Sequence, residues 1–414
     1  MKKFLIILIF FCGVLQAQEN PDLKALLKSA VTINSKLSAS EYEKLIALAR
    51  VNRFNEQPSP SVEIMQDRIP FNLMDAGEFS ITYMQPLKLF GKLDASEKYY
   101  SYQAIKPEIA REELQKDLTK EVKENYFLLS QNERKVRTNH TQQEIIKSIT
   151  RSIEIKYSTS KASQTDILKS NTELQKLLYD EIQLNADRKM IVNNLRTLTG
   201  IDLPADYSTS DELITSYLEL NLNDTLKLQN MIVANNPKFR LLNYEKTLNS
   251  LERNMTVLER KPDLTLKSGY MYMSDVHLNA FRLGAEIDLP FMPWNVRRID
   301  ASLQENNYIS QEIDSRFNSA LIYMRAELRN KITLINSQQE KIKFIKEITV
   351  PQLVQTLNSE LIAYQTGTLE YMNVIDTYRM LRDTDFMLIE EETKNLLYIN
   401  ELERLVSSEI LKIN

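Results

Sequence analysis

The sequence predicts a mostly α-helical protein with a small β-portion, built from two copies of one helix–strand–strand–long helix–helix unit. The first observation is composition: glycine accounts for only 7 of 414 residues, far below the ~7% of ordinary globular proteins, so tight turns are rare. The second is that apolar residues recur at three- and four-residue spacing over long stretches, as at Leu114, Leu118 and Val122, which is the period of a helix face. The third is a set of ten-residue segments in which apolar and polar residues alternate, which is the period of a strand.

The N-terminus has the pattern of a secretory signal peptide. Two lysines precede an apolar run from Phe4 to Leu15, and Leu-Gln-Ala-Gln ends the segment, so we expect residues 1–17 to be removed after Ala17. The apolar run is shorter than the ~20 residues of a membrane span. Cys12 is the only cysteine of the chain. It would leave with the signal, so the exported protein is expected to contain no disulfide and no cysteine nucleophile.

Five local matches recur in the same order about two hundred residues apart, which indicates an internal duplication. The segment NSKLSASEYEKL at Asn34 matches NPKFRLLNYEKT at Asn236, and Asp-Ala-Ser occurs at both Asp94 and Asp300. The mature chain is therefore expected to divide into a first repeat, an inter-repeat linker and a second repeat: 18–200, 201–223 and 224–414.

Each repeat is expected to contain three helices, of which the middle one is very long. The predicted helices are 22–52, 92–156 and 164–199 in the first repeat, and 224–259, 296–363 and 370–406 in the second. A helix of ~65 residues is ~100 Å long, far longer than a compact domain needs. The two shorter helices of each repeat sum to nearly the same length, so together they could pair with the long one over its whole course.

Segments with one apolar face and one polar face lie between the first and second helices of each repeat. In AFRLGAEIDL, from Ala280, the apolar residues Phe281 and Leu283 begin one face, and the other face consists of Arg282, Gly284, Glu286 and Asp288. Transmembrane barrels use such strands, with apolar residues toward lipid and polar residues toward the lumen, although a half-buried soluble sheet shows the same alternation. Four strands cannot close a barrel, and lipid does not tolerate an open sheet edge. Membrane-spanning strands would therefore require several chains to share one barrel, and three chains would supply twelve strands.

Two similar turns interrupt the helical pattern, one in each repeat. YSTSKASQTDIL begins at Tyr157 and YQTGTLEYMNVID begins at Tyr364. These motifs and their order resemble the TolC-like outer-membrane efflux channels, also called outer membrane factors, over essentially the whole mature chain. The family's Pro, Ala-Tyr-x-x-Gly and Asp/Asn-Val-Leu/Ile-Asp pattern is matched by Pro351, Ala363, Tyr364, Gly367, Asn373, Val374, Ile375 and Asp376. In the first repeat, Asp166 takes the acidic place and Ser160 stands where glycine is usual.

The resemblance implies a fold that is mostly α with a membrane β-barrel portion. In this family a homotrimer forms a twelve-stranded barrel in the outer membrane, continued by a long α-helical tunnel into the periplasm. The hairpin turns, here at Tyr157, Ser160 and Gly367, lie at the periplasmic tip, where glycine supplies the positive φ of a tight reversal. The tips constrict the pore and dock the inner-membrane machinery. Arg282, Glu286 and Asp288 are expected to face the barrel lumen, and the linker is expected at the equator of the tunnel.

The resemblance assigns a pore gate at the tip to Asp166, Tyr364, Asn373 and Asp376. From spacing alone, Asp166, Asn373 and Asp376 are better explained as solvated helix residues, and it is the resemblance that supports a role in the gate. One aspartate per chain near a three-fold axis makes a ring of like charge, which can select or bind cations. The family's latch arginine, shortly after the tip glycine, has no counterpart here, because that neighbourhood is Thr368, Leu369 and Glu370.

The sequence contains no recognisable catalytic constellation. Its two histidines, His140 and His277, fall in different repeats, and there is no phosphate-binding glycine loop. A net charge of -4 and the lack of a basic tract argue against nucleic acid as a partner. We therefore expect no enzymatic activity, no cofactor and no dedicated metal site. Methionine thioethers can ligate Cu(I), but methionine is also an ordinary apolar filler. The strand-region methionines are Met65, Met84, Met271, Met273 and Met292.

The predicted function is that of the exit duct of a tripartite efflux system, which passively conducts drugs or metal ions from periplasm to exterior. Such a duct lies in the outer membrane with a large periplasmic portion, and its partners are a periplasmic adaptor and an inner-membrane pump. The length of the chain is similar to that of the proteins in the family's heavy-metal efflux branch. One alternative is a periplasmic adaptor, which has a single helical hairpin, and the other is a structural coiled-coil protein of the cell envelope, which would lack matched two-faced strands.

Overall fold

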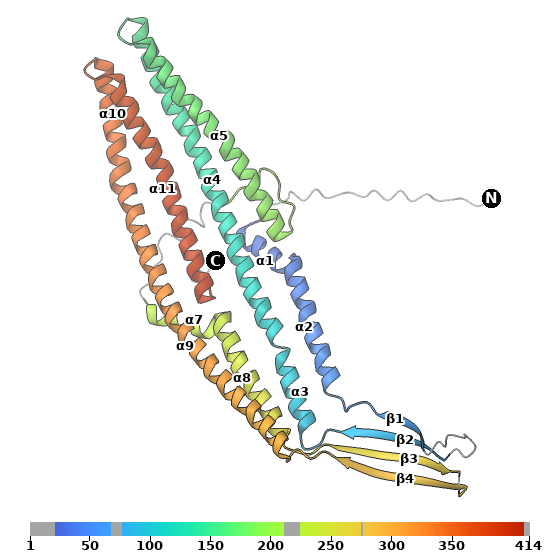
Figure 1. Cartoon of the computed structure of the whole chain (residues 1–414). Coiled ribbons are helices and arrows are strands. Elements are labelled where there is room, and N and C mark those ends of the chain that lie inside the picture. The colour runs from blue at the N-terminus through green and yellow to red at the C-terminus, as the bar shows by residue number, and fades with distance from the viewer. Residues whose placement is uncertain (1–20, 68–76, 211–223, 275, 410–414) are drawn as a thin grey trace, which may run out of the picture.

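The computed structural model of the chain describes residues 21–67, 77–210, 224–274 and 276–409. These residues form an elongated helical bundle with a sheet at one end and two helical hairpin turns at the other (Figure 1). The predicted signal peptide at 1–17, including Cys12, lies outside the described residues, as do residues 211–223 of the predicted linker.

The two halves of the chain have the same order of elements. The first half contains α1 (Leu23–Ile33), α2 (Ser35–Phe54), β1 (Ser61–Asp67), β2 (Glu78–Leu87), α3 (Lys92–Gln103), α4 (Lys106–Ser158) and α5 (Gln164–Thr199). The second half contains α7 (Thr225–Asn235), α8 (Pro237–Leu258), β3 (Leu264–Met273), β4 (Leu278–Ile287), α9 (Pro293–Phe344), the π-helix η1 (Ile345–Thr349), α10 (Val350–Thr366) and α11 (Tyr371–Val406). The mostly α-helical fold with a small antiparallel sheet is thus confirmed.

The first helix of each repeat was predicted to be continuous, and this is wrong in both halves. Asn34 and Asn236 have extended backbone angles, with ψ of 124° and 126°. Each asparagine oxygen caps the following helix by accepting the backbone N–H two residues later. Each asparagine amide donates to a carbonyl at the end of the last helix of its own repeat, from Asn34 to Leu198 (3.4 Å) and from Asn236 to Leu405 (2.8 Å). The sequence match at these positions therefore reflects one repeated helix-breaking contact.

The long helix predicted over 92–156 is divided into α3 and α4. Pro107 follows the first residue of α4, and because proline has no N–H it cannot donate to the carbonyl of Gln103 one turn earlier. That carbonyl accepts the hydroxyl of Tyr244 from α8 instead (3.4 Å). The helix predicted over 296–363 is likewise interrupted, here by η1, which directly precedes the turn that contains Pro351.

The four strands form one antiparallel sheet in the order β1-β2-β3-β4. The register places Ile64, Ile81, Tyr270 and Phe281 in one row across the sheet, so the apolar residues of every strand share one face. This face is open to the surroundings: Phe281 is 71% exposed and Leu283 is 75% exposed. The predicted alternation of the strands is therefore correct. None of the described helices has an apolar stretch long enough to span a membrane.

Two separate apolar cores stabilise the helical bundle. The trunk core lies near the middle of the molecule and includes Leu129 of α4, Ile335 of α9 and Leu396 of α11. The tip core lies toward the hairpin turns and includes Ile146 of α4 and Tyr378 of α11. In both regions α4 contacts α11 as well as its hairpin partner α5. The two repeats are therefore joined along the α4–α11 seam.

Candidate functional site

The candidate site is the pair of hairpin turns at one end of the bundle (Figure 1). The first turn joins α4 to α5 and the second joins α10 to α11. Ser160 and Gly367 occupy equivalent places in them, with positive φ angles of 57° and 84°. Glycine adopts this conformation without steric penalty, whereas serine does so at a small cost. Tyr157, at the start of the first turn, is exposed.

Contacts between the two tips centre on Tyr364 of α10. The ammonium group of Lys156, from α4, lies 4.0 Å from the centre of the Tyr364 ring and also donates to the Tyr364 carbonyl. Burial, and secondarily the nearby carboxylate of Asp166, raise the pKa of the Tyr364 hydroxyl. The structure thus brings Asp166 of the first repeat close to Tyr364 of the second, although their predicted role as a gate remains a prediction.

Asp166 has a local structural task at the start of α5. Its carboxylate accepts the backbone N–H of Ser163 (3.2 Å), while the Ser163 hydroxyl oxygen accepts the N–H of Thr165 (2.9 Å). This reciprocal arrangement is a capping box, which satisfies N–H groups that have no partner inside the helix.

Asn373 and Asp376 lie one turn apart on an exposed face of α11. The Asp376 carboxylate is not isolated, because the guanidinium group of Arg379 lies 3.1 Å from it. Any ring of Asp376 side chains would therefore have a cation beside each carboxylate.

A cluster of four charged residues near the tips was not anticipated from the sequence. Glu173 of α5 is only 1% exposed and accepts hydrogen bonds from Arg379 (2.6 Å) and Arg382 (3.1 Å) of α11 and from Lys176 (2.9 Å) of its own helix. Burial alone would raise the pKa of the Glu173 carboxyl, but the hydrogen bonds from Arg379 and Lys176 outweigh it and hold the pKa below its ordinary value. The cluster therefore ties the first hairpin to the second.

One sequence signal could have indicated this cluster. Arg379 and Arg382 are spaced i, i+3, so both guanidinium groups emerge from the same side of α11. The acidic partner lies about two hundred residues away, among many acidic residues of α5, and only the packing of the helices identifies it.

At the other end of the molecule, the polar face of the sheet contains two cross-strand ion pairs. Arg282 pairs with Glu78 (3.3 Å) and Glu286 pairs with Lys267 (2.5 Å). Asp288, the third residue predicted to face a lumen, directly follows the end of β4.

Four of the strand-region methionines, Met65, Met84, Met271 and Met273, lie on the same polar face of the sheet, and Met292 precedes α9. The guanidinium group of Arg282 lies 2.8 Å from the Met271 sulfur, and this positive charge opposes cation binding at that atom. Across the described residues there is no group of three His, Cys, Asp or Glu side chains placed to hold a metal ion.

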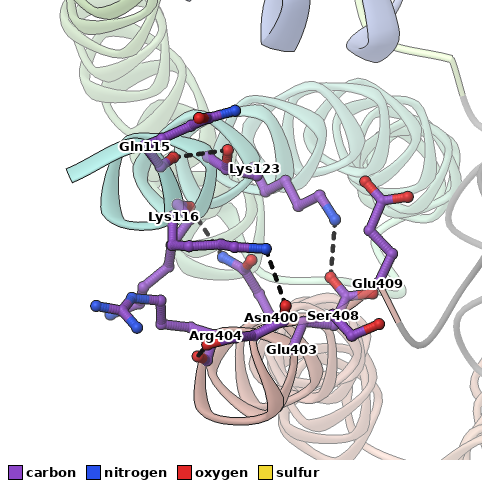
Figure 2. A pocket seen from close by; sticks show the side chains of 11 residues that line it. Gln115, Lys116, Lys123, Asn400, Glu403, Arg404, Ser408 and Glu409 are labelled. Atoms are coloured by element: carbon purple, nitrogen blue, oxygen red, sulfur yellow. Dashed lines mark hydrogen bonds and ion pairs between the residues drawn. The ribbon is translucent and has the colours of Figure 1, made fainter. Parts of the chain in front are cut away.

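A polar cavity of about 260 Å³ lies between α4 and the end of α11 (Figure 2). Lys123, only 2% exposed, extends across it to Glu403 (2.8 Å), and Lys116 donates to the carbonyl of Ser407 (2.8 Å). Burial, together with repulsion from Arg404, lowers the pKa of Lys116. These contacts join the last turn of α11 to α4, so we interpret the residues that line the cavity as stabilising the helical bundle.

No protein-family model matches the chain, and no curated protein matches its sequence. Several solved structures match it over most of its length. CusC superposes with a TM-score of 0.77 at 16% identity, covering 94% of this chain and 92% of its own. The outer-membrane channel OprN superposes with a TM-score of 0.75 at 15% identity, covering 94% of this chain and 90% of its own. The outer membrane protein VceC of Vibrio cholerae superposes with a TM-score of 0.73 at 14% identity, covering 94% of this chain and 97% of its own. The TolC-like fold predicted from the sequence is therefore confirmed: this chain folds as these outer-membrane channel proteins do.

Proposed function

We propose that this protein is the exit duct of a tripartite efflux system, located in the outer membrane and passively conducting cargo from periplasm to exterior. The observation that supports it most is the combination of a sheet with an exposed apolar face and a long helical bundle, superposable on outer-membrane channels over 94% of the chain. The structural neighbours are channel proteins and not enzymes. A periplasmic adaptor is not favoured, because the hairpin is duplicated here.

The sheet supports assembly from several copies. β1 and β4 are its two edges, and a lipid environment requires their backbone N–H and C=O groups to be paired. The apolar face, with Leu283 near the middle of β4, has the composition of a lipid-facing surface. Pairing β4 of one copy with β1 of the next would close a barrel, and three copies supply the twelve strands expected of this fold.

The helices have a matching pair of edges. α5 contacts α4, α4 contacts α11, and α11 contacts α9 and α10, so α5 and α9–α10 are the outermost elements. Both edges expose large apolar side chains, among them Tyr179 and Ile182 on α5 and Ile322 and Tyr323 on α9. Exposed apolar stripes of this kind mark interaction surfaces. A head-to-tail contact between the two edges generates a closed ring when the rotation from copy to copy closes, and three copies would require a rotation of about 120°.

The first prediction tests this assembly. Unboiled, detergent-extracted protein should migrate as a trimer and be recovered in the outer-membrane fraction. Ile182→Lys should weaken the trimer, because it places a charge in the proposed contact between copies. Glu144→Lys, at an exposed position of α4, which is not an edge helix, is the matched control and should leave the trimer intact. A stable monomer, or recovery as a soluble periplasmic protein, would rule out the duct.

The second prediction concerns the proposed gate at Asp376. Around a three-fold axis this residue contributes three carboxylates, whose repulsion a bound cation relieves, so Mg²⁺ or La³⁺ should block the pore. Asp376→Ala removes all three carboxylates, each of which contributes about 1 kcal/mol of attraction in water, so the block should weaken by up to roughly a hundredfold, reduced by the Arg379 guanidinium beside each carboxylate. The measurement is single-channel current in a planar bilayer. Undiminished block would locate the cation site elsewhere, and failure to trimerise would mean that Asp376 is structural.

The proposed partners follow from the position of the tips. A duct of this kind receives cargo from an inner-membrane pump through a periplasmic adaptor, which would contact the turns near Tyr157 and Gly367. The gate residues Asp166, Tyr364, Asn373 and Asp376 would lie at this junction.

A further inference from the structure

The packing of α4 against α5 and α11 changes from apolar to polar and back along the helix: Asn132 and Asn139 donate to carbonyls of α5, and Gln142 donates to Asp385 of α11. In α4, the buried apolar residues of the trunk core end at Leu129, and those of the tip core begin at Ile146. The buried side chains between them are all polar: Ser130, Asn132, Asn139, Gln142 and Gln143. This interval covers about 16 residues, or ~24 Å of helix.

The facing helices add buried polar residues at the same level, beside the buried apolar residues Ile342 of α9 and Ile389 of α11. α9 contributes buried Gln338, and α11 contributes buried Glu392, Thr393 and Asn395. Gln142 donates to Asp385 (2.8 Å), Arg134 pairs with Glu392, and Gln338 donates to the Glu391 carbonyl (2.9 Å). We refer to these nine buried polar residues of α4, α9 and α11 as the polar belt.

The polar belt is incompletely hydrogen-bonded. Asn395 is 0% exposed, yet neither its amide nitrogen nor its amide oxygen has a hydrogen-bond partner among the described residues. The hydroxyl of Ser130 and the amide oxygens of Asn132 and Gln142 likewise have no hydrogen-bond partner among the described residues. Buried groups without partners oppose tight packing, whereas the apolar cores on either side are closely packed. The belt therefore carries the desolvation cost of these unpartnered groups, in contrast to the aliphatic side chains on either side of it.

The second long helix loses regular α-geometry next to this belt. η1 widens to π-helical hydrogen bonding, and Pro351 removes the N–H that would bond to Glu347. Every residue of η1 is at least partly exposed. Phe344, Ile345 and Met387 line an open groove of about 570 Å³ beside it, so side chains there have room to move. π-helical turns inside α-helices often mark functional sites, and they are a recognised cause of helix bending. α4, by contrast, is continuous through this level.

We propose that η1 and the polar belt form a joint. At this joint the section that contains the tip core and the hairpin turns, here called the pore end, bends relative to the section that contains the trunk core, while both apolar cores stay intact. Polar contacts can exchange partners as the angle changes, and the π-helical turn can lengthen or shorten one helix relative to its neighbours. The tip core and the Glu173 cluster lie beyond the joint, so the pore end can change its shape without disturbing the trunk. The importance of this bending for conduction rests on the proposed duct, but the bending itself does not.

Amide hydrogen exchange of the detergent-solubilised full chain tests the joint. Protection should be high in the trunk core, fall at 130–143, 338–351 and 385–395, and rise again in the tip core before the turns. Without a joint, protection would decline steadily from trunk to tips through end fraying, and that profile would overturn the proposal. Because exchange needs no conduction, a protein that fails to conduct leaves this test unaffected.

Two matched substitutions in the belt sharpen the test. Asn395→Leu replaces an unpartnered buried amide by an apolar side chain of similar size, so exchange over 385–395 should slow about tenfold or more and the melting temperature should rise. Asn139→Leu removes an amide that does donate, to the Leu177 carbonyl (3.0 Å), and should lower the melting temperature. Identical behaviour of the two variants would contradict a joint built on unpartnered polar groups. If Asn395→Leu does not fold, the wild-type exchange profile alone decides.

Discussion

Leu283→Arg is expected to prevent the protein from assembling in the outer membrane. Leu283 is central in β4, 75% exposed on the apolar face of the sheet. If this face contacts lipid, an arginine near the bilayer midplane costs about 2–4 kcal/mol. A trimer contains the substitution three times, so the penalty reaches roughly 6–12 kcal/mol per assembly, comparable to the whole folding stability of a typical domain. The measurement is the yield of heat-modifiable trimer in the outer-membrane fraction.

Glu286→Arg is the matched control, because it introduces the same side chain three residues away on the opposite face. Among the described residues Glu286 forms a partly exposed ion pair with Lys267, and such pairs contribute about 0–1 kcal/mol. This variant should assemble normally. Equal assembly of both variants, or better assembly of Leu283→Arg, would show that the apolar face does not contact lipid.

The strand faces could be predicted from the sequence because their period is local. Phe281 and Leu283 alternate with Arg282 within a few residues, and the register then aligns the same face on all four strands. The duplication was also visible, since Asn34 and Asn236 sit in matching segments. Their helix-breaking role was missed, because it depends on a carbonyl acceptor more than 160 residues away in the same repeat.

The features missed at the site have the same physical origin. The charge cluster at Glu173 and the polar belt around Asn395 exist only because α4 of the first repeat packs against α11 of the second, which brings Glu173 of α5 within reach of the α11 arginines. In the sequence these residues belong to ordinary charged helix faces. The π-helical turn before Pro351 was missed for a different reason: proline predicts a local disturbance of a helix, but not whether the helix kinks, ends or widens.

In the proposed duct, Glu173→Gln is expected to shift the equilibrium between a closed and an open pore strongly toward the open pore. The Glu173 carboxylate is the only anion that links Arg379 and Arg382 of α11 to α5 among the described contacts, and glutamine cannot neutralise them. Breaking a fully buried ion pair costs about 3–5 kcal/mol. Arg379 is 37% exposed, so solvent reduces this to about 2–3 kcal/mol. That corresponds to roughly a 30- to 150-fold change in the closed-to-open ratio, measurable as single-channel conductance in a planar bilayer.

Lys176→Ala provides the control for this prediction. Lys176 also bonds to Glu173, but it belongs to the same helix and is mostly exposed, so its removal leaves the link between α5 and α11 in place. Conductance should stay close to that of the unmodified protein. If Glu173→Gln and Lys176→Ala conduct alike, the cluster does not hold the tips together.

The same cluster predicts a pH dependence of definite sign. Because the pKa of Glu173 in the folded protein lies below its ordinary value of 4.5, its ion pairs contribute their full stabilisation above pH ~4.5 and lose it as the pH falls through the lowered pKa. If these ion pairs hold the proposed duct closed, the unmodified protein should stay closed at pH 7 and pH 5 and open only in stronger acid. Glu173→Gln has no carboxylate to protonate, so its conductance should already be high at neutral pH and should not show this acid-induced rise. An equal rise in the variant would assign the acid response to another group.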